Sequence, residues 1–474
     1  MKTYYYVDSP AGSGKTHSLS HFAVDEAKAH RKIVISQPTK RLLKQTLKAI
    51  SGIDGTIKVT AIYTQGRQTS AIPRIVDHLT NAAPHTGEVL LITHESLRRL
   101  PGGNRKFWSL VVDEIPSVFV HLPLRIRYTH DIVTQHLGSE ELISGITVLS
   151  AAHPQRVDDL IRQAKDDQNI ETFLQLLNAV RDEKQLVCAE TTRLTDLLSG
   201  DALKGQSDFF LIQTPDYLDG FADVTLMGAN ATHSELVVLW EKLFPDIEFK
   251  PHPSLSGLLR YDRHENGHRL TLYYCFERWS KIYSQSATPE TGEDTVLERL
   301  NVQLAKFFDT SPFLWQANKD VEDDFFEDAK RLPHVPHGLD EPDYMKVHNV
   351  ALLSAVNRET PAFKFLGLLG LDDSTITATL AYQNEYQAMM RCSLRDPAAT
   401  HPVNVVVMTQ GSAEWIAQRF PGCTIRAFDS GLSGPRRRGG RHIEAPKKTR
   451  AEIQQAYRDR QKLAAQTRSS PPAV

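Results

Sequence analysis

The feature that most constrains the fold of this chain is a glycine-rich loop over residues 9–16, with the sequence SPAGSGKT. The aromatic and β-branched run Thr3–Val7 before the loop is typical of a strand. Residues 17–30 after the loop place apolar side chains at helical spacing. A strand, a small-residue loop and a helix form the context that a phosphate-binding loop requires. The sequence therefore predicts an α/β domain built around a phosphate site.

The residue types of this loop suit a nucleoside triphosphate. Gly12 and Gly14 allow the backbone to curl until several N–H groups face one anion, and the start of the helix adds partial positive charge. Lys15 can reach the β- and γ-phosphates of ATP, while the hydroxyl of Thr16 can hold Mg²⁺. The predicted phosphate cradle consists of Ser9, Gly12, Ser13, Gly14, Lys15 and Thr16.

A second motif supports this interpretation. The apolar run Leu110–Val112 leads directly to two carboxylates, Asp113 and Glu114. A buried parallel strand has this pattern, and the carboxyl end of such a strand is where these sheets place ligands. We expect Asp113 to hold Mg²⁺ through water and Glu114 to orient the attacking water. Hydrophobic strands that end in an acid are common, so the pair gains its weight from the glycine-rich loop.

Composition excludes several classes of protein. The net charge of −2 argues against a globally basic nucleic-acid binder but leaves room for a local basic groove. The four cysteines are far apart and form no CxxC pair, which argues against a zinc knuckle or an iron–sulfur cluster. Scattered cysteines fit a reducing cytoplasm. We find neither an apolar signal region nor a run long enough to span a bilayer, so we expect a cytoplasmic protein without a membrane partner.

The pattern of elements divides the chain into domains. A polar, helix-patterned stretch reads as a helical insertion over residues 120–215, and either Ile146–Ala152 or Ala222–Thr232 closes the first sheet, with the second favoured. The run Pro312–Trp315 opens a second α/β unit. From Ser430 onward the composition becomes basic and rich in glycine, as in a flexible tail. The predicted domains are 1–250 with the insertion, 251–430, and the tail 431–474.

Together these motifs resemble those of superfamily 2 helicases, the group that contains the DEAD/DEAH-box proteins. The resemblance covers about two thirds of the chain. It implies an α/β fold of two RecA-like P-loop NTPase domains, with parallel sheets flanked by helices. Ser9 replaces the usual first glycine, and Ile115-Pro116 follows the acids in place of Ala-Asp or Ala-His. These departures leave the subfamily undecided.

The resemblance also implies residues of the second domain. Gly338 and Asp340, followed by an apolar strand, resemble motif V and would contact the nucleotide. Gln387, Arg391 and Arg395 resemble motif VI, although Met390 replaces its glycine. A helix predicted over Gln383–Arg395 places these three side chains on one face, from which the arginines would stabilise the transition state. A solvated helix face is the alternative. The predicted catalytic residues are Glu114, Gln387, Arg391 and Arg395.

Two further motifs resemble elements that contact the tracked strand in these helicases. Pro38, Thr39 and Lys40 resemble motif Ia, and a basic helix after a strand suits a nucleic-acid backbone. An ordinary strand-to-helix turn explains these residues equally well. Thr93 and His94 are similar to a second contact element, although His94 could equally be a core or capping histidine.

Three functions compete. The first is an ATP- and Mg²⁺-dependent helicase or translocase on single-stranded or duplex nucleic acid, with DNA favoured over RNA. It would act in replication, recombination or repair of a phage or mobile element, and its tail could dock a replication protein. The second is a terminase-like packaging ATPase, whose nuclease acids would have to come from Asp320 and Glu322–Asp324. The third is a DNA-binding protein with a vestigial P-loop, which the intact Lys15 and Thr16 argue against.

Overall fold

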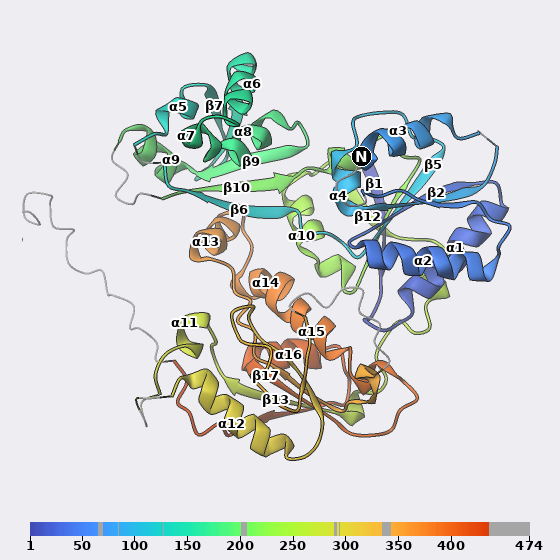
Figure 1. Cartoon of the computed structure of the whole chain (residues 1–474), viewed down its shortest axis with the longest axis vertical. Coiled ribbons are helices and arrows are strands. Elements are labelled where there is room, and N and C mark those ends of the chain that lie inside the picture. Colours follow the sequence, from blue (N-terminus) through green and yellow to red (C-terminus); the bar gives the residue numbers. More distant parts are fainter. Residues whose placement is uncertain are drawn as a thin grey trace, which may run out of the picture. The chain divides into compact units, whose positions relative to one another are not determined.

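The computed structural model describes residues 1–64, 70–83, 85–126, 128–200, 206–288, 292, 294–333 and 343–435. By internal contacts the chain separates into two compact units, Met1–Ser433 and Gly434–Val474. The fold below is that of the first unit (Figure 1). The predicted motif V residues Gly338 and Asp340 lie outside the described residues, and so does the predicted basic tail from Arg436 onward.

The first unit begins with a parallel sheet that contains the glycine-rich loop. Among the described residues it has seven strands in the order β12-β1-β11-β5-β2-β4-β3, and every pairing is parallel. The bounds are β1 Lys2–Asp8, β2 Lys32–Gln37, β3 Val59–Ala61, β4 Glu88–Thr93, β5 Trp108–Asp113, β11 Val224–Gly228 and β12 Ile247–Pro251. β11, which lies within the run Ala222–Thr232, pairs between β1 and β5, so this run rather than Ile146–Ala152 belongs to the first sheet, as favoured from the sequence.

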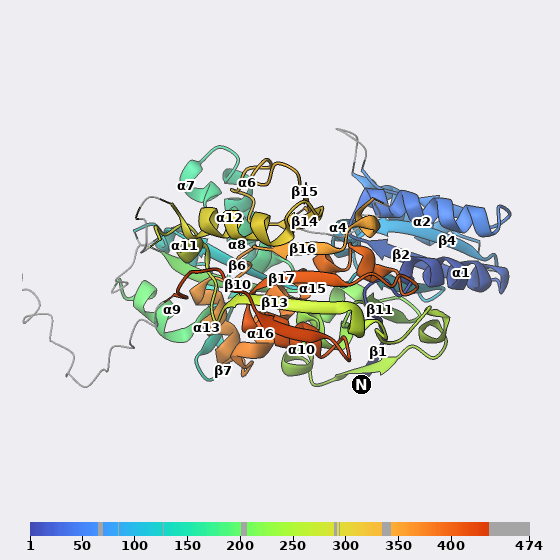
Figure 2. The same cartoon turned by 90° about the horizontal axis from the view of Figure 1, so that it is seen from below.

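Helices cover both faces of this sheet because side chains alternate along each strand. Ile33 and Ile35 of β2 pack into the cluster that holds α1, whereas Val34 packs into the cluster on the opposite face. The helices are α1 Lys15–Lys28 and α2 Lys40–Ile53 on one face, and α3 Ala71–Asn81, α4 His94–Arg99 and α10 Glu235–Leu243 on the other. Figure 2 shows α1 and α2 side by side. We call this sheet and its helices the first lobe.

The insertion differs from the prediction. Within the described residues it is a five-stranded antiparallel sheet, in the order β6-β10-β9-β8-β7, with helices, so the expectation of a helical insertion is wrong. Its strands are β6 Phe119–Leu124, β7 Leu137–Ile143, β8 Ile146–Ala151, β9 Gln185–Glu190 and β10 Ser207–Gln213; its helices are α5 Asp131–Thr134, α6 Pro154–Gln163, α7 Gln168–Glu171, α8 Leu174–Arg181 and α9 Thr191–Leu198. Helical periodicity between residues 154 and 181 dominated the pattern, while the strands pair with distant partners that periodicity does not register.

A second parallel sheet forms the second lobe. Its strand order is β15-β14-β16-β17-β13-β18 in the described part of the chain, again with parallel pairings throughout. The strands are β13 Leu270–Phe276, β14 Phe313–Gln316, β15 Lys330–Arg331, β16 Asn349–Leu352, β17 Val403–Thr409 and β18 Thr424–Ala427; the principal helices are α12 Val296–Phe308, α15 Gln383–Met389 and α16 Gln410–Ala417. Two parallel sheets flanked by helices confirm the expected pair of RecA-like domains.

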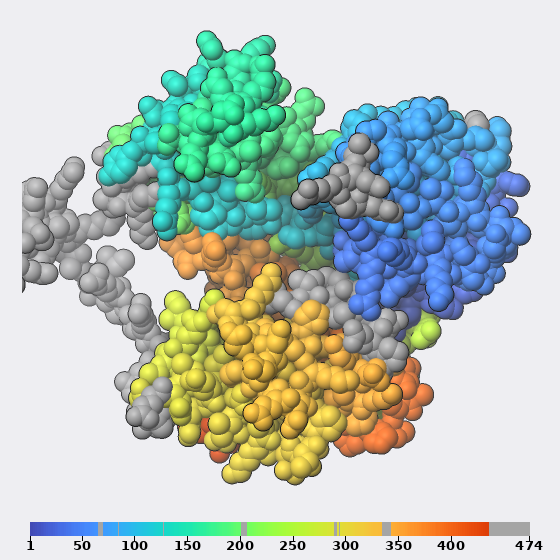
Figure 3. Space-filling view, in the orientation of Figure 1, coloured from blue at the N-terminus to red at the C-terminus, as the bar shows by residue number. Residues whose placement is uncertain are grey.

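One segment of the second lobe packs on the first. Between β16 and α15 lie α13 Thr360–Leu368 and α14 Asp373–Thr377, followed by a π-helical turn, Ala378–Tyr382. The apolar side chains of α13 and α14 join the core cluster of the first lobe. The Phe365 ring stacks on the ring of Phe210 in the insertion, with 4.0 Å between the ring centroids. Figure 3 shows the orange surface of this region against the insertion. We call residues 358–382 the bridging segment.

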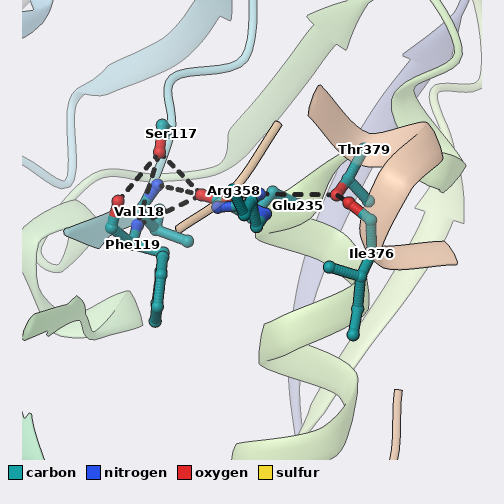
Figure 4. A network of polar contacts seen from close by, with 7 residues as sticks. All are labelled: Ser117, Val118, Phe119, Glu235, Arg358, Ile376 and Thr379. Carbon is teal, nitrogen blue, oxygen red and sulfur yellow. Dashed lines mark hydrogen bonds and ion pairs between the residues drawn. The ribbon is translucent and has the colours of Figure 1, made fainter. Parts of the chain in front are cut away.

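A buried ion pair holds the bridging segment in place (Figure 4). Arg358 pairs with Glu235 of α10, and both side chains are about nine-tenths buried. Glu235 also accepts hydrogen bonds from the Ser117 hydroxyl at 2.6 Å and from the N–H groups of Val118 and Phe119 at 3.2 Å. These bonds satisfy the buried carboxylate, as such a group requires. The pair therefore joins the second lobe to the point where the insertion leaves the first.

Within the described ranges, no helix combines the length and the apolarity that crossing a bilayer would need.

Candidate nucleotide site

The glycine-rich loop lies between β1 and α1. Gly12 and Gly14 have φ values of +87° and +84°, in the left-handed region that other residues rarely adopt. At the start of the loop, the Ser9 N–H donates to the carbonyl of Gly228 in β11 at 3.2 Å. The first N–H groups of α1, from Lys15 onward, have no partners inside the helix and suit an anion. The loop thus has the backbone form that the sequence predicts.

The paired acids follow at the end of β5. Asp113 is buried, and its Oδ2 accepts a hydrogen bond from Nε2 of Gln37 at 2.8 Å. Burial and the neighbouring charge of Glu114 raise the pKa of Asp113 to about 6. The second oxygen, Oδ1, is buried and has no hydrogen-bond partner among the described residues. Gln37 was not identified from the sequence, because an amide at a strand end carries no pattern of its own.

These oxygens fit a hard divalent cation. No group of three or more His, Cys, Asp or Glu side chains in the described part of the chain is placed to hold a metal. Mg²⁺ does not require such a cage, since it commonly takes one or two carboxylates, phosphate oxygens and water. The unsatisfied Oδ1 of Asp113 and the hydroxyl of Thr16 are therefore suitable residues to hold it.

Glu114 has an unusual backbone. Its φ is +65°, a conformation that is uncommon for a residue with a side chain and that recurs at functional sites. Its N–H donates to the carbonyl of Met227 in β11 at 2.8 Å. Its carboxylate Oε1 lies 4.0 Å from Nζ of Lys15. The turn thus brings the predicted water-orienting group next to the predicted phosphate-binding lysine.

Several residues predicted to contact nucleic acid make hydrogen bonds within the first lobe instead. His94 is buried, with Nδ1 2.8 Å from the Ser36 hydroxyl and Nε2 2.8 Å from the carbonyl oxygen of Glu114. Thr93 caps α4, and Thr39 caps α2 by accepting the N–H of Leu42 at 3.2 Å. His94 therefore supports the turn at Glu114. This is the buried structural role that the sequence analysis gave as the alternative to a contact with nucleic acid. Lys40 is exposed and Pro38 is half-buried; their contact with nucleic acid stays a prediction.

The predicted motif VI helix is shorter than expected. α15 ends at Met389, so Arg391 and Arg395 do not share a helical face with Gln387, and that part of the prediction is wrong. After Met389 the chain tightens, with the N–H of Arg391 on the carbonyl of Ala388 at 3.1 Å. It is then drawn to the sheet through the N–H of Ser393, which donates to the carbonyl of Val347 at 2.9 Å.

Arg395 nevertheless reaches the glycine-rich loop. A Cβ atom placed on Gly12 would lie 3.1 Å from Cγ of Arg395 and 3.4 Å from Cε of Met390. Gln387 and Arg391 are half-buried nearby in sequence. Gly12 is thus required both for its backbone conformation and for the close approach of the second lobe.

The chain between the two lobes also covers the loop. The N–H of Arg260 donates to the carbonyl of Ser13 at 3.0 Å, and the Arg260 side chain comes within 3.1 Å of a Cβ placed on Gly14. The hydroxyl of Tyr261 donates to the carbonyl of Ala11 at 3.1 Å. Nothing in the sequence marks these residues, because they lie outside any periodic element.

The acids proposed for a packaging nuclease have other partners. Asp320 lies 3.0 Å from the ammonium of Lys281, and Asp323 lies 2.5 Å from the guanidinium of Arg331. Asp323 is almost fully exposed. These contacts are surface ion pairs, so they give the packaging interpretation no support.

A glycine-rich loop after β1, with paired acids at the end of β5 two strands away in the same parallel sheet, defines the chain as a P-loop NTPase. Residues 2–160 match the family model for the DEAD/DEAH box helicase. Over these residues, which include β1 to β5 of the first lobe and β6 to β8 of the insertion, the chain is similar to superfamily 2 helicases. Members of this family hydrolyse ATP, which makes ATP hydrolase the class of enzyme.

Solved structures show a more distant likeness. The chain is similar to Saccharomyces cerevisiae Dbp5 bound to RNA and ADP BeF3, with a TM-score of 0.36 and 12% identity over 90% of this chain and 85% of that one. A variant of the same protein, also bound to RNA and ADP BeF3, has a TM-score of 0.37 and 11% identity over the same shares. No curated protein matches the sequence.

Proposed function

We propose that this protein is an ATP-dependent nucleic-acid helicase or translocase, with Mg²⁺ as its metal. The observation that carries the proposal is the position of Arg395: a side chain of the second lobe lies at Gly12, in the phosphate loop of the first. An arginine delivered from a second domain is worth about 10³–10⁵ in rate in NTPases that use one. The same contact makes hydrolysis depend on how the lobes meet.

In this mechanism the main-chain N–H groups of Gly12, Gly14 and the first turn of α1 bind the phosphates, and Lys15 neutralises their charge. Thr16 and Asp113 would hold Mg²⁺, which would supply further neutralisation of the phosphate charge. Glu114 orients the attacking water, and its strained turn is supported from behind by His94. Arg395 and Arg391 stabilise the charge that develops on the transferred phosphoryl group.

Motion on a strand follows from the two-lobe arrangement. If the arginines are in place only when the lobes close on ATP, hydrolysis removes the charge that holds the lobes together. A strand bound across both lobes would then be gripped and released once in each cycle. Thr39, Lys40 and Thr93, near the carboxyl ends of β2 and β4, are the residues that we propose for the first-lobe grip.

The finer assignments are also proposals. We favour DNA over RNA as the strand, a cytoplasmic location, and a role in replication, recombination or repair of a phage or mobile element. These preferences rest on the resemblance in sequence alone. The basic tail would dock a replication protein or add phosphate contacts, which would make the affinity for nucleic acid dependent on salt.

The decisive experiment measures ATP turnover by the full chain without nucleic acid and with single-stranded DNA, single-stranded RNA or duplex. We expect turnover that requires Mg²⁺ and that at least one strand stimulates severalfold; the strand that stimulates most identifies the substrate. Strand displacement on a tailed duplex then separates unwinding from tracking. ATP turnover that no nucleic acid changes would contradict the helicase proposal while leaving the ATPase assignment intact.

A further inference from the structure

A second contact joins the two lobes at the phosphate loop. The N–H of Ala11 donates to the hydroxyl oxygen of Tyr386 at 2.8 Å, and the carbonyl of Ala11 accepts the Tyr261 hydroxyl at 3.1 Å. Tyr386 belongs to α15 in the second lobe, and Tyr261 to the chain between the lobes. One loop residue is therefore held by two tyrosines that come from outside its lobe.

The hydroxyl of Tyr386 has a second partner. Nε2 of His264 lies 2.7 Å from it, and the His264 ring stacks on Phe420 with 4.2 Å between ring centroids. Burial and the positive charge of Lys15 lower the pKa of His264 to about 4, so the imidazole is neutral near pH 7. A neutral Nε2 can accept the Tyr386 proton while the phenol oxygen accepts the Ala11 N–H. We call Ala11, Tyr261, His264 and Tyr386 the tyrosine clamp.

The clamp leaves the phosphate site available. It uses only the main chain of Ala11, whereas the first N–H groups of α1 beyond Gly14 remain without helical partners and can bind an anion. Tyr386 itself is buried. An N–H group enclosed at this position needs an acceptor, and Tyr386 supplies it. Clamp and nucleotide are therefore compatible.

The clamp also sits at the right point in the chain. Tyr386 immediately precedes Gln387 on α15, and the turn after that helix carries Arg391 and Arg395. We propose that Tyr386 is a positioning residue for ATP hydrolysis: its hydroxyl fixes the phosphate loop at Ala11 relative to the helix that leads to Arg395. This inference rests on the proposed ATPase activity. It gives a role in that activity to Tyr386, a residue outside the sequence motifs from which the activity was inferred.

The test compares two tyrosine-to-phenylalanine variants of the full chain. Tyr386→Phe keeps the ring and removes the hydroxyl. We expect kcat to fall about tenfold, the order expected when a buried donor loses its acceptor, while KM for ATP stays within about twofold. Tyr382→Phe is the matched control, because it removes a hydroxyl one helical turn earlier, where the ring packs against Trp415 in the second lobe. It should retain the wild-type kcat.

His264 provides a second, independent variant. His264→Gln keeps a side-chain hydrogen-bonding group near Nε2 and should retain most of the wild-type kcat, whereas His264→Leu should lower kcat as Tyr386→Phe does. Melting temperatures and the affinity for a fluorescent ATP analogue, measured on all four variants, separate positioning from loss of fold. A purely structural role would lower stability or nucleotide affinity together with kcat.

The outcomes separate the clamp from the proposed function. If Lys15→Ala abolishes turnover and Tyr386→Phe leaves kcat unchanged, the clamp is refuted and the ATPase stands. A fall in kcat of equal size in Tyr386→Phe and Tyr382→Phe would also refute the clamp. If the wild-type chain has no turnover above that of Lys15→Ala, the proposed function fails, and the clamp fails with it.

Discussion

The first lobe carries its proposed nucleotide-binding residues at the ends of parallel strands, whereas the second lobe carries the proposed catalytic arginines on a turn beyond a short helix. In the first lobe, the residues Gly12 to Thr16 and the acids Asp113 and Glu114 follow directly from β1 and β5. Their positions are set by local backbone geometry. In the second lobe, Arg395 reaches Gly12 because distant contacts place the turn that carries it. The spacing of residues within a motif is thus a good guide to the first kind of site and a poor guide to the second.

The largest effect should come from the locally determined side of this comparison. Lys15→Ala removes the charge that faces the phosphates, and we expect ATP turnover to fall by about 10³-fold or more. Steady-state phosphate release with a saturating strand measures it. Lys28→Ala, at the other end of the same helix, is the control. Substantial hydrolysis by Lys15→Ala would remove the phosphate-loop assignment.

The second largest effect should come from the arginines of the second lobe, whose positions depend on tertiary contacts. Arg395→Ala should leave nucleotide binding nearly unchanged and lower kcat by about 10³-fold, as loss of an arginine finger does. Arg391→Ala should cost less, because the structure brings Arg395 rather than Arg391 next to Gly12. Arg426→Ala, an exposed arginine on β18, serves as the control. A larger loss for Arg391→Ala than for Arg395→Ala would contradict the assignment of Arg395 as the arginine that acts on the phosphates.

A third variant tests how firmly the bridging segment joins the lobes. Arg358→Ala leaves the buried Glu235 without its ion-pair partner, and we expect a loss of about 3 kcal/mol in the free energy of unfolding. Urea denaturation measures it. Arg162→Ala is the control, because it breaks an ion pair with Asp159 in which the arginine side chain is largely exposed. It should lower the free energy of unfolding by less than about 1 kcal/mol. Equal losses in the two variants would show that the bridging contact contributes no more than a surface pair.

The smallest effect concerns pH. The pKa of Asp113 is raised to about 6, so its carboxyl group gains a proton as the pH falls through 6. A protonated carboxyl holds Mg²⁺ poorly. We expect the Mg²⁺ concentration for half-maximal turnover to rise severalfold between pH 7.5 and pH 5.5, and Asp113→Asn to abolish this dependence together with most of the activity. A requirement for Mg²⁺ that does not vary over this range would argue that another group holds the metal.

Particular residues show where prediction from the sequence stopped. The strands that contain Thr3–Val7 and Leu110–Val112 were expected because a glycine-rich loop after the first run, taken together with paired acids after the second, indicates a parallel sheet with a phosphate site. The antiparallel sheet of the insertion was not expected. The run Ile146–Ala152 was recognised as strand-like, but periodicity does not encode which strands it pairs with. Gln37, Tyr261, His264 and Tyr386 were missed for a related reason. Each acts through one or two hydrogen bonds of a single polar side chain, and a single polar residue gives no periodic pattern in the sequence.

The sequence alone determined the phosphate loop, the paired acids and the two parallel sheets, because these depend on short-range backbone geometry and on apolar patterns within single strands. Only the tertiary structure decided that the insertion contains a sheet, that α15 ends before the arginines, and that Tyr386 binds Ala11. Each of these depends on hydrogen bonds or side-chain packing between residues far apart in the chain. Such contacts come from the folded arrangement as a whole, so no local window of sequence contains them.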